Sequence, residues 1–133
     1  MGYNAWIGKS MFLILPDQIP GAHAALVKFF SDPENEDLFY LPKEQPIQDA
    51  TVLEILESAG FHGKLDALGG IANLGYSPAA YYGESFGIMN AIASFVHSGS
   101  YLDWIDEEGE RWRWLFENGT VREQSAKITY EDT

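Results

Sequence analysis

Three segments that alternate apolar and polar residues fill the last third of the sequence, and they constrain the fold more than any other feature. They cover residues 101–106, 111–117 and 121–130. Alternation of this length is typical of β-strands that bury one face. Asn118-Gly119 joins the last two segments and is the strongest short signal for a hairpin turn, while Glu107-Glu108-Gly109-Glu110 joins the first two. The pattern predicts a three-stranded antiparallel meander.

Apolar residues at helical spacing predict three helices before the meander. The first has Pro20 in its first turn and ends before Pro33, because the residue preceding a proline is pushed out of helical geometry. The second begins with the capping box Thr51-Val52-Leu53-Glu54 and stops at Gly60. The third is expected over residues 84–97. The buried face of the first helix is expected to comprise Ala22, Ala25, Leu26, Phe29 and Phe30.

The remaining patterns predict further strands. Residues 3–7 and 12–15 indicate either one long bulged strand or a hairpin, and the two runs around Gly69-Gly70 indicate a hairpin with a two-residue turn. Residues 38–41 could dock as a short strand. We therefore expect an α+β fold with an antiparallel sheet and about three helices packed on one face. A length of 133 residues fits one domain over residues 1–133.

The charge balance excludes several classes of function. The chain has 20 Asp and Glu against 8 Lys and Arg, a formal charge of −12. This charge opposes direct binding to nucleic acid and to anionic membrane surfaces, where affinity comes from Lys and Arg. It favours basic partners. Along the sequence, basic residues do not cluster beyond pairs such as Arg111 and Arg113.

Cellular location and redox chemistry also follow from simple patterns. The chain contains no cysteine, so it has no disulfide, no thiolate nucleophile and no Cys-ligated metal. The early apolar run from Met11 to Leu15 is too short for a signal peptide, and no stretch reaches the length of a spanning helix. We expect a cytoplasmic protein. On this interpretation Asn118-Gly119-Thr120 is a turn and not a glycosylation site.

One catalytic pattern occurs, Gly83-Glu84-Ser85-Phe86-Gly87, which matches the nucleophile turn of α/β-hydrolases. The only later histidine is His97, and on a continuous helix it would lie about 18 Å from Ser85. We therefore interpret Ser85 as a helix-start residue and assign no catalytic residue. His23, His62 and His97 lack the spacing of metal ligands, so we expect no metal and no cofactor.

The first candidate partner-binding surface is the meander. On its middle strand Trp112, Trp114 and Phe116 share one face, and Arg111 and Arg113 point the other way, where they could pair with Glu123. The favoured interpretation is that the rings cover the core. The alternative is that one or two rings stay exposed within a charged rim, as at an interface hot spot. The candidate residues are Trp104, Asp106, Glu107, Glu108, Glu110, Trp112 and Trp114, with Asp103 also on the rim.

The second candidate surface is the acidic run between Asp32 and Asp37. Its candidate binding residues are Glu34, Glu36 and Asp37, with Phe39 and Tyr40 close behind. The alternative is an ordinary solvated loop, because blocks of like charge usually form loops that bind no partner.

The segment from Gly99 to Trp114 begins Gly-Ser-Tyr and ends Gly-Glu-Arg-Trp-Arg-Trp. It resembles the C-terminal part of small, uncharacterised bacterial and phage-associated acidic proteins. Those proteins begin Met-Gly-Tyr, as this chain does. The resemblance covers the C-terminal meander and the first few residues, and no catalytic residue comes with it. It implies an accessory protein of a phage or mobile element, a class that often blocks host machinery such as CRISPR complexes with basic channels.

Three observations together predict a non-enzymatic acidic binding protein. They are the negative net charge, the lack of a catalytic pattern in the sequence and the resemblance just described. Its expected role is an accessory inhibitor of a basic protein or nucleoprotein complex, in the manner of an anti-CRISPR protein. A toxin-neutralising immunity protein is the first alternative. A small enzyme or ligand-binding domain, with paired carboxylates in a pocket beside the loop from Pro42 to Pro46, is the alternative of a different class. Assembly through strand edges at residues 3–7 or 121–130 also stays open, and with it the oligomeric state.

Overall fold

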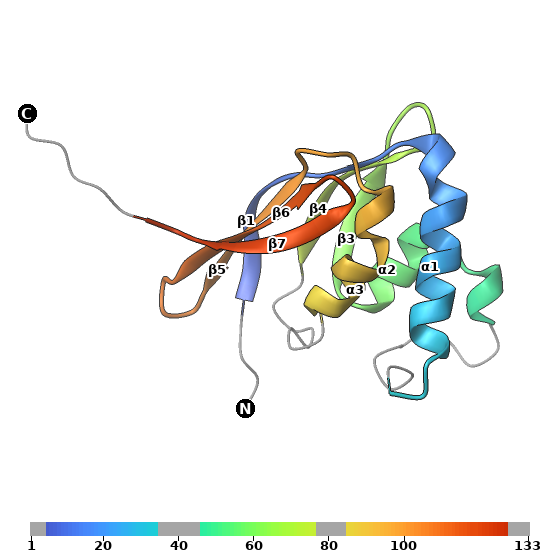
Figure 1. The fold of residues 1–133 in the computed structure, drawn as a ribbon, viewed down its shortest axis with the longest axis horizontal. Helices are drawn as coiled ribbons and strands as arrows, with labels where there is room; N and C mark the ends of the chain where they lie inside the picture. Colours follow the sequence, from blue (N-terminus) through green and yellow to red (C-terminus); the bar gives the residue numbers. More distant parts are fainter. Residues whose placement is uncertain (1–4, 35–45, 77–84, 128–133) are drawn as a thin grey trace, which may run out of the picture.

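The structure is a computed structural model that describes residues 5–34, 46–76 and 85–127. It has the predicted α+β fold, with helices gathered on one side of antiparallel sheets (Figure 1). The strands are β1 Ala5–Met11, β2 Leu13–Ile14, β3 Phe61–Leu65, β4 Ile71–Tyr76, β5 Tyr101–Asp106, β6 Arg111–Glu117 and β7 Thr120–Ser125. The helices are α1 Ile19–Ser31, α2 Val52–Ser58 and α3 Ser85–Ile92, with 3₁₀ turns η1 Pro16–Gln18, η3 Ile47–Asp49 and η5 Ala93–Phe95.

The strands form two sheets where one was expected. The first has the order β1-β5-β6-β7 and the second the order β2-β4-β3. The N-terminal segment serves both sheets, because β1 pairs with β5 and β2 pairs with β4. In β1, Ile7 pairs with Trp104 and Lys9 pairs with Asp103, which leaves Gly8 as an extra residue. The predicted bulge is therefore confirmed and the hairpin version is wrong, but the segment divides at Phe12 into two strands of different sheets and does not form one long strand.

The meander β5-β6-β7 is confirmed, with the first two strands at their predicted bounds and the third ending before residue 126. Asn118 and Gly119 have φ angles of 53° and 81°, as a tight hairpin turn requires. The last strand ends at Ser125, and the predicted continuation to Tyr130 lies partly outside the described residues. The possible strand at 38–41 lies outside them as well.

Local signals located the first two helices correctly, but not the length of the third. α1 buries Ala22, Leu26 and Phe30. α2 has the complete capping box, in which the amide of Glu54 donates to Thr51 and the amide of Thr51 donates to Glu54. α3 ends at Ile92 and continues only as the 3₁₀ turn η5, so the predicted helix to residue 97 is too long.

The hairpin between β3 and β4 also differs from its prediction. Its loop covers residues 66–70, where a two-residue Gly69-Gly70 turn was expected. The reason is Asp66, whose carboxylate accepts hydrogen bonds from the amides of Leu68 and Gly70 at 2.8 and 2.9 Å. A side chain that replaces backbone partners in this way stabilises a longer loop.

The buried residues form a hydrophobic core that joins both sheets to the helices. The ring of Trp104 from β5 contacts Tyr76 of β4 and Phe61 of β3, with centroids at 5.0 and 6.3 Å. Trp114 of β6 contacts Phe86 of α3 at 5.2 Å. One face of the four-stranded sheet is thus turned toward the core, and alternation directs the other face outward.

Two glycines at the third position of their helices give a matched test of this packing. A Cβ on Gly21 of α1 would overlap the ring of Phe95, whereas a Cβ on Gly87 of α3 would make ordinary contact with Phe29. Gly→Ala in a helix normally stabilises by about 0.5–1 kcal/mol. We expect Gly87→Ala to do so and Gly21→Ala to destabilise by about 1–3 kcal/mol, because overpacking outweighs the propensity gain. Urea unfolding measures both; stabilisation by both variants would contradict the packing of α1 against η5.

Candidate functional site

Asp106 shapes the turn between β5 and β6. Its side chain is buried, with 5% of the residue exposed, and its carboxylate accepts hydrogen bonds from the amides of Glu108 and Glu110, both at 2.9 Å. The amide of Gly109, which has a φ of 86°, donates to the Asp106 carbonyl. Asp106 is one of the predicted partner-binding residues. In the structure its buried carboxylate holds the turn, so it acts by positioning the glutamates that follow it.

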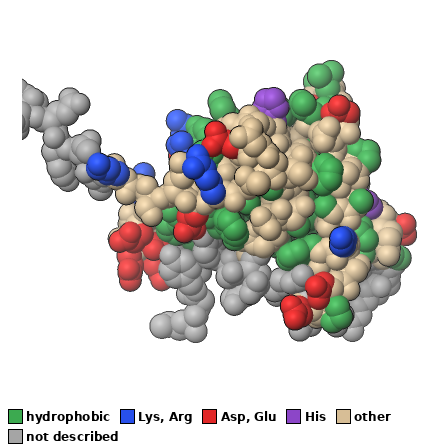
Figure 2. Space-filling model, viewed as in Figure 1, with side chains coloured by type: hydrophobic (Ala, Val, Ile, Leu, Met, Phe, Trp, Pro, Cys, Tyr) green, Lys and Arg blue, Asp and Glu red, His purple; other side chains and the backbone are tan. Residues whose placement is uncertain are grey.

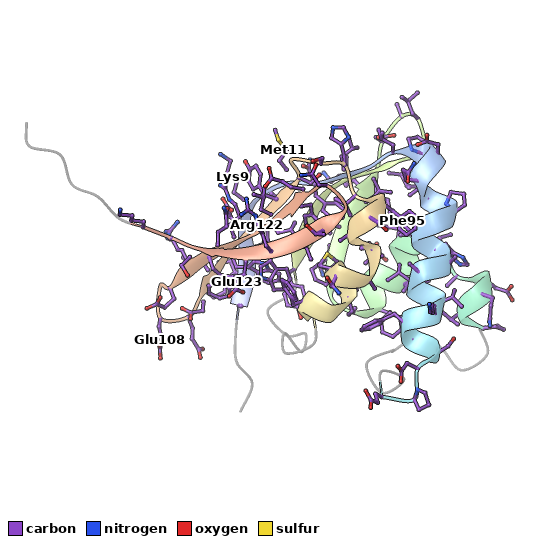
Figure 3. The ribbon with its side chains drawn as sticks, in the orientation of Figure 1. Lys9, Met11, Phe95, Glu108, Arg122 and Glu123 are labelled. Carbon is purple, nitrogen blue, oxygen red and sulfur yellow. The ribbon has the colours of Figure 1, made fainter. Side chains whose placement is uncertain are left out.

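The three glutamates of this turn form the acidic tip, defined as Glu107, Glu108 and Glu110. All three are exposed. The tip stands at the end of the four-stranded sheet that lies away from the helices (Figure 2), and Glu108 points outward from it (Figure 3). The tip therefore places three exposed carboxylates on an ordered turn.

The tryptophans divide into two groups. Trp104 and Trp114 are each 1% exposed and contact one another at 4.6 Å, so neither ring reaches a partner. The interpretation that the rings cover the core holds for these two. Trp112 is half-buried and stacks on Trp104, with centroids 6.4 Å apart and planes 7° apart. Of the tryptophans predicted at the binding surface, Trp112 alone keeps exposed ring surface.

A hollow of about 410 Å³ lies beside Trp112, and we call it the Trp112 hollow. Glu123 stands at its rim, where its carboxylate accepts a hydrogen bond of 3.0 Å from the indole nitrogen of Trp114. The sequence allowed a pairing of Glu123 with Arg111 or Arg113. Strand register instead places Glu123 opposite Trp114, on the tryptophan face of the sheet. The lining residues are Asp106, Glu110, Arg111, Trp112, Glu123, Ser125 and Ala126.

The opposite face of the sheet holds an ordered ion pair. The guanidinium of Arg113 donates to both carboxylate oxygens of Asp103, at 2.6 and 3.0 Å, and lies 4.1 Å from the centroid of Tyr101. The hydrogen bond to Asp103 raises the pKa of Arg113. Asp103 therefore belongs to this face and not to the acidic rim.

The second candidate surface is described only in part. Glu34 is exposed, and its amide donates to the carboxylate of Asp32 at 3.0 Å. Glu36 and Asp37 lie outside the described residues, as do Phe39 and Tyr40. The site is therefore built from the acidic tip and the Trp112 hollow.

The hydrolase-like pattern does not form a catalytic pair. Ser85 is buried at the start of α3, and its hydroxyl lies 3.0 Å from the hydroxyl of Tyr76. Burial raises the pKa of Tyr76, which keeps this phenol neutral. His97 lies beyond α3 and η5, where its amide donates to the carbonyl of Leu13, and the ring of His23 bonds to the Ala50 carbonyl at 2.8 Å.

Two further findings apply to the described part of the chain. No group of three His, Asp or Glu side chains there lies close enough to hold a metal ion. None of its helices combines the length and the apolar character needed to cross a membrane.

Sequence reasoning missed one feature, a gathering of cations on the outer face of the sheet. Lys9 is remote from Arg113 in sequence, but both side chains flank Asp103 in the register of β1, β5 and β6. Only the pairing of β1 with β5 brings these two residues together, so no pattern within a single segment of the sequence predicts the cluster of cations.

Replacing Asp106 tests its positioning role. We expect Asp106→Ala to lower the free energy of unfolding by about 1–3 kcal/mol, because two amides lose a charged acceptor. Glu108→Ala is the control from the same turn and should change it by no more than about 0.5 kcal/mol. Urea unfolding gives both values, and amide hydrogen exchange at Glu110 should accelerate only in Asp106→Ala. Equal effects of the two changes would contradict the assignment.

Comparison of this chain with protein-family models, with curated proteins and with solved structures found no match. The function proposed for this chain therefore rests on the charge and geometry of the site, together with the resemblance of the segment from Gly99 to Trp114.

Proposed function

We propose that this chain is a non-enzymatic acidic binding protein that engages a basic protein or nucleoprotein complex. Within that class we infer an accessory inhibitor from a phage or mobile element, comparable to an anti-CRISPR protein. A partner of this kind implies a cytoplasmic setting. The resemblance of the segment from Gly99 to Trp114 to phage-associated proteins supports the inhibitor class.

The observation that carries the proposal is the combination of the acidic tip with the Trp112 hollow. A partner Arg or Lys that enters the hollow can lie against the half-exposed ring of Trp112, an arrangement that attracts cations. The carboxylates of Glu110 and Glu123 stand at the same hollow and can accept hydrogen bonds from the entering group. An aromatic floor with a charged rim is the usual composition of an interface hot spot.

The acidic tip adds long-range attraction to this short-range contact. Glu107 and Glu108 are exposed at the end of the sheet, where a partner can approach without meeting the helices (Figure 1). The formal charge of −12 steers a basic partner toward the protein and speeds the encounter. This attraction weakens with salt, since exposed charges are screened over about 8 Å at physiological ionic strength.

The non-enzymatic part of the proposal rests on how potential catalytic groups are used. Asp106 is buried and accepts two turn amides, and Ser85 is buried beside Tyr76. Each of these groups has a structural task in the described residues. The alternative of a pocket beside the loop from Pro42 to Pro46 depends on residues 42–45, which lie outside the described part.

Charge reversal at the tip tests the proposal. Tagged protein is incubated with bacterial lysate, and bound proteins are identified by mass spectrometry after washes at low salt and at about 0.5 M salt. We expect a basic partner that is released by high salt. For the double variant Glu107→Lys, Glu108→Lys, binding of that partner should weaken about tenfold, because two attractive charges become repulsive.

The matched control is Asp17→Lys with Glu57→Lys, which changes net charge equally at exposed positions on η1 and α2. This control should keep most of the binding. A partner retained at high salt, or equal losses in the two double variants, would contradict the assignment of the tip. Absence of any specific partner at both salt concentrations would count against a binding function as a whole.

A further inference from the structure

The outer face of the four-stranded sheet concentrates the cations of an otherwise acidic chain. Only 8 Lys and Arg occur in the sequence. The register aligns Lys9, Asp103, Arg113 and Gln124 in one row across β1, β5, β6 and β7. Arg122 lies on the same face of β7, and Lys127 follows that strand. The basic side chains appear along this side of the sheet in Figure 2, and Lys9 projects from it in Figure 3.

Two cations of this face are neutralised by neighbouring carboxylates. Arg113 binds Asp103, and Arg122 binds Glu117 at 2.7 Å. Among the described residues, Lys9, Arg111 and Lys127 have no carboxylate within 4.0 Å. The face therefore carries three positive charges that no described acid balances.

These three cations line one hollow of about 460 Å³, which we call the basic hollow. This volume lies in the range of small-molecule sites. Gln124 and Ser125 also line the hollow and offer neutral hydrogen-bonding groups. Arg113 and Asp103 form part of its wall and are held in place by their mutual ion pair and by the ring of Tyr101.

We propose that the basic hollow binds a small ligand that carries phosphate groups. A phosphate presents several charged oxygens, and the hollow offers the ammonium groups of Lys9 and Lys127 together with the forked donors of Arg111. A ligand with two or three negative charges matches the three unbalanced cations. The class that fits is therefore a phosphorylated metabolite or a mononucleotide.

Size and charge favour a small ligand over a nucleic-acid strand. Arg111 directly follows the acidic tip, so a strand that continued past the hollow in this direction would meet Glu107, Glu108 and Glu110. The net charge of −12 also repels an extended polyanion. A compact anion confined to the hollow does not reach the acidic tip. Its repulsion by the net charge of the protein is reduced by salt, which screens charges over about 8 Å.

This inference goes beyond the proposed function and stands on a different face of the molecule. The Trp112 hollow opens on the tryptophan face of the sheet, and the basic hollow is built from the outer-face row around Arg113. The two hollows adjoin at the edge of the sheet, where four residues line both of them: Arg111, Trp112, Ser125 and Ala126. Lys9 and Lys127 line only the basic hollow, and Glu110 and Glu123 line only the Trp112 hollow. Variants at these unshared residues therefore test the two binding activities separately.

Titration with inorganic pyrophosphate, followed by amide chemical shifts of ¹⁵N-labelled protein, tests the proposal. We expect saturable shifts at Lys9, Arg113, Gln124 and Lys127. The double variant Lys9→Gln, Lys127→Gln should bind about tenfold more weakly, because two charged donors that line only the basic hollow are lost. The matched control is Lys28→Gln with Lys64→Gln, which removes the same charge from exposed positions on α1 and β3 and should leave the affinity unchanged.

Shift dispersion in the same spectra verifies that both double variants are folded. Shifts that do not saturate, or equal weakening in the two variants, would overturn the basic hollow as a site. A parallel titration with a single-stranded oligonucleotide distinguishes a small-ligand site from a nucleic-acid surface. If it bound more tightly than pyrophosphate, with a steep salt dependence, the face would be a nucleic-acid surface and the small-ligand assignment would be wrong.

Discussion

Burial of Trp104 is the interaction on which the rest of the structure depends. Its ring contacts Phe61 and Tyr76 from the three-stranded sheet and Trp114 from its own sheet. A buried aromatic cluster of this size contributes a large share of core stability. Burial of this ring also determines which face of β5 and β6 turns toward the core. Because side chains alternate along a strand, it thereby determines on which face each charged residue of these strands lies.

The separation of charge on this sheet follows from that constraint. Asp103 and Arg113 are outward because Trp104 and Trp114 are inward, and Lys9 joins them through the bulged pairing of β1 with β5. The acids gather where the strands end, since Asp106 folds the turn that exposes the acidic tip. A strongly acidic chain thus acquires an acidic end and a basic face on the same four strands.

Features encoded in short segments could be predicted from the sequence. The capping box at Thr51 and the turn at Asn118-Gly119 are local, and both were predicted correctly. Features that depend on distant partners could not. The division into two sheets and the approach of Lys9 to Arg113 both require strand register. The sequence favoured burial of the tryptophan rings, but the contact of Trp114 with Phe86 depends on how α3 packs on the sheet. The half-exposure of Trp112 follows from its place near the end of the sheet, which alternation alone does not reveal.

We propose that Trp112 serves binding while the neighbouring tryptophans serve the fold. A comparison of Trp112→Ala with Leu115→Ala tests this division, because Leu115 is a half-buried residue on the opposite face of the same strand. Affinity for the captured basic partner is measured for both variants at matched stability, established by urea unfolding. We expect about a tenfold loss of affinity for Trp112→Ala and little change for Leu115→Ala. Unchanged affinity in a folded Trp112→Ala protein would contradict this division.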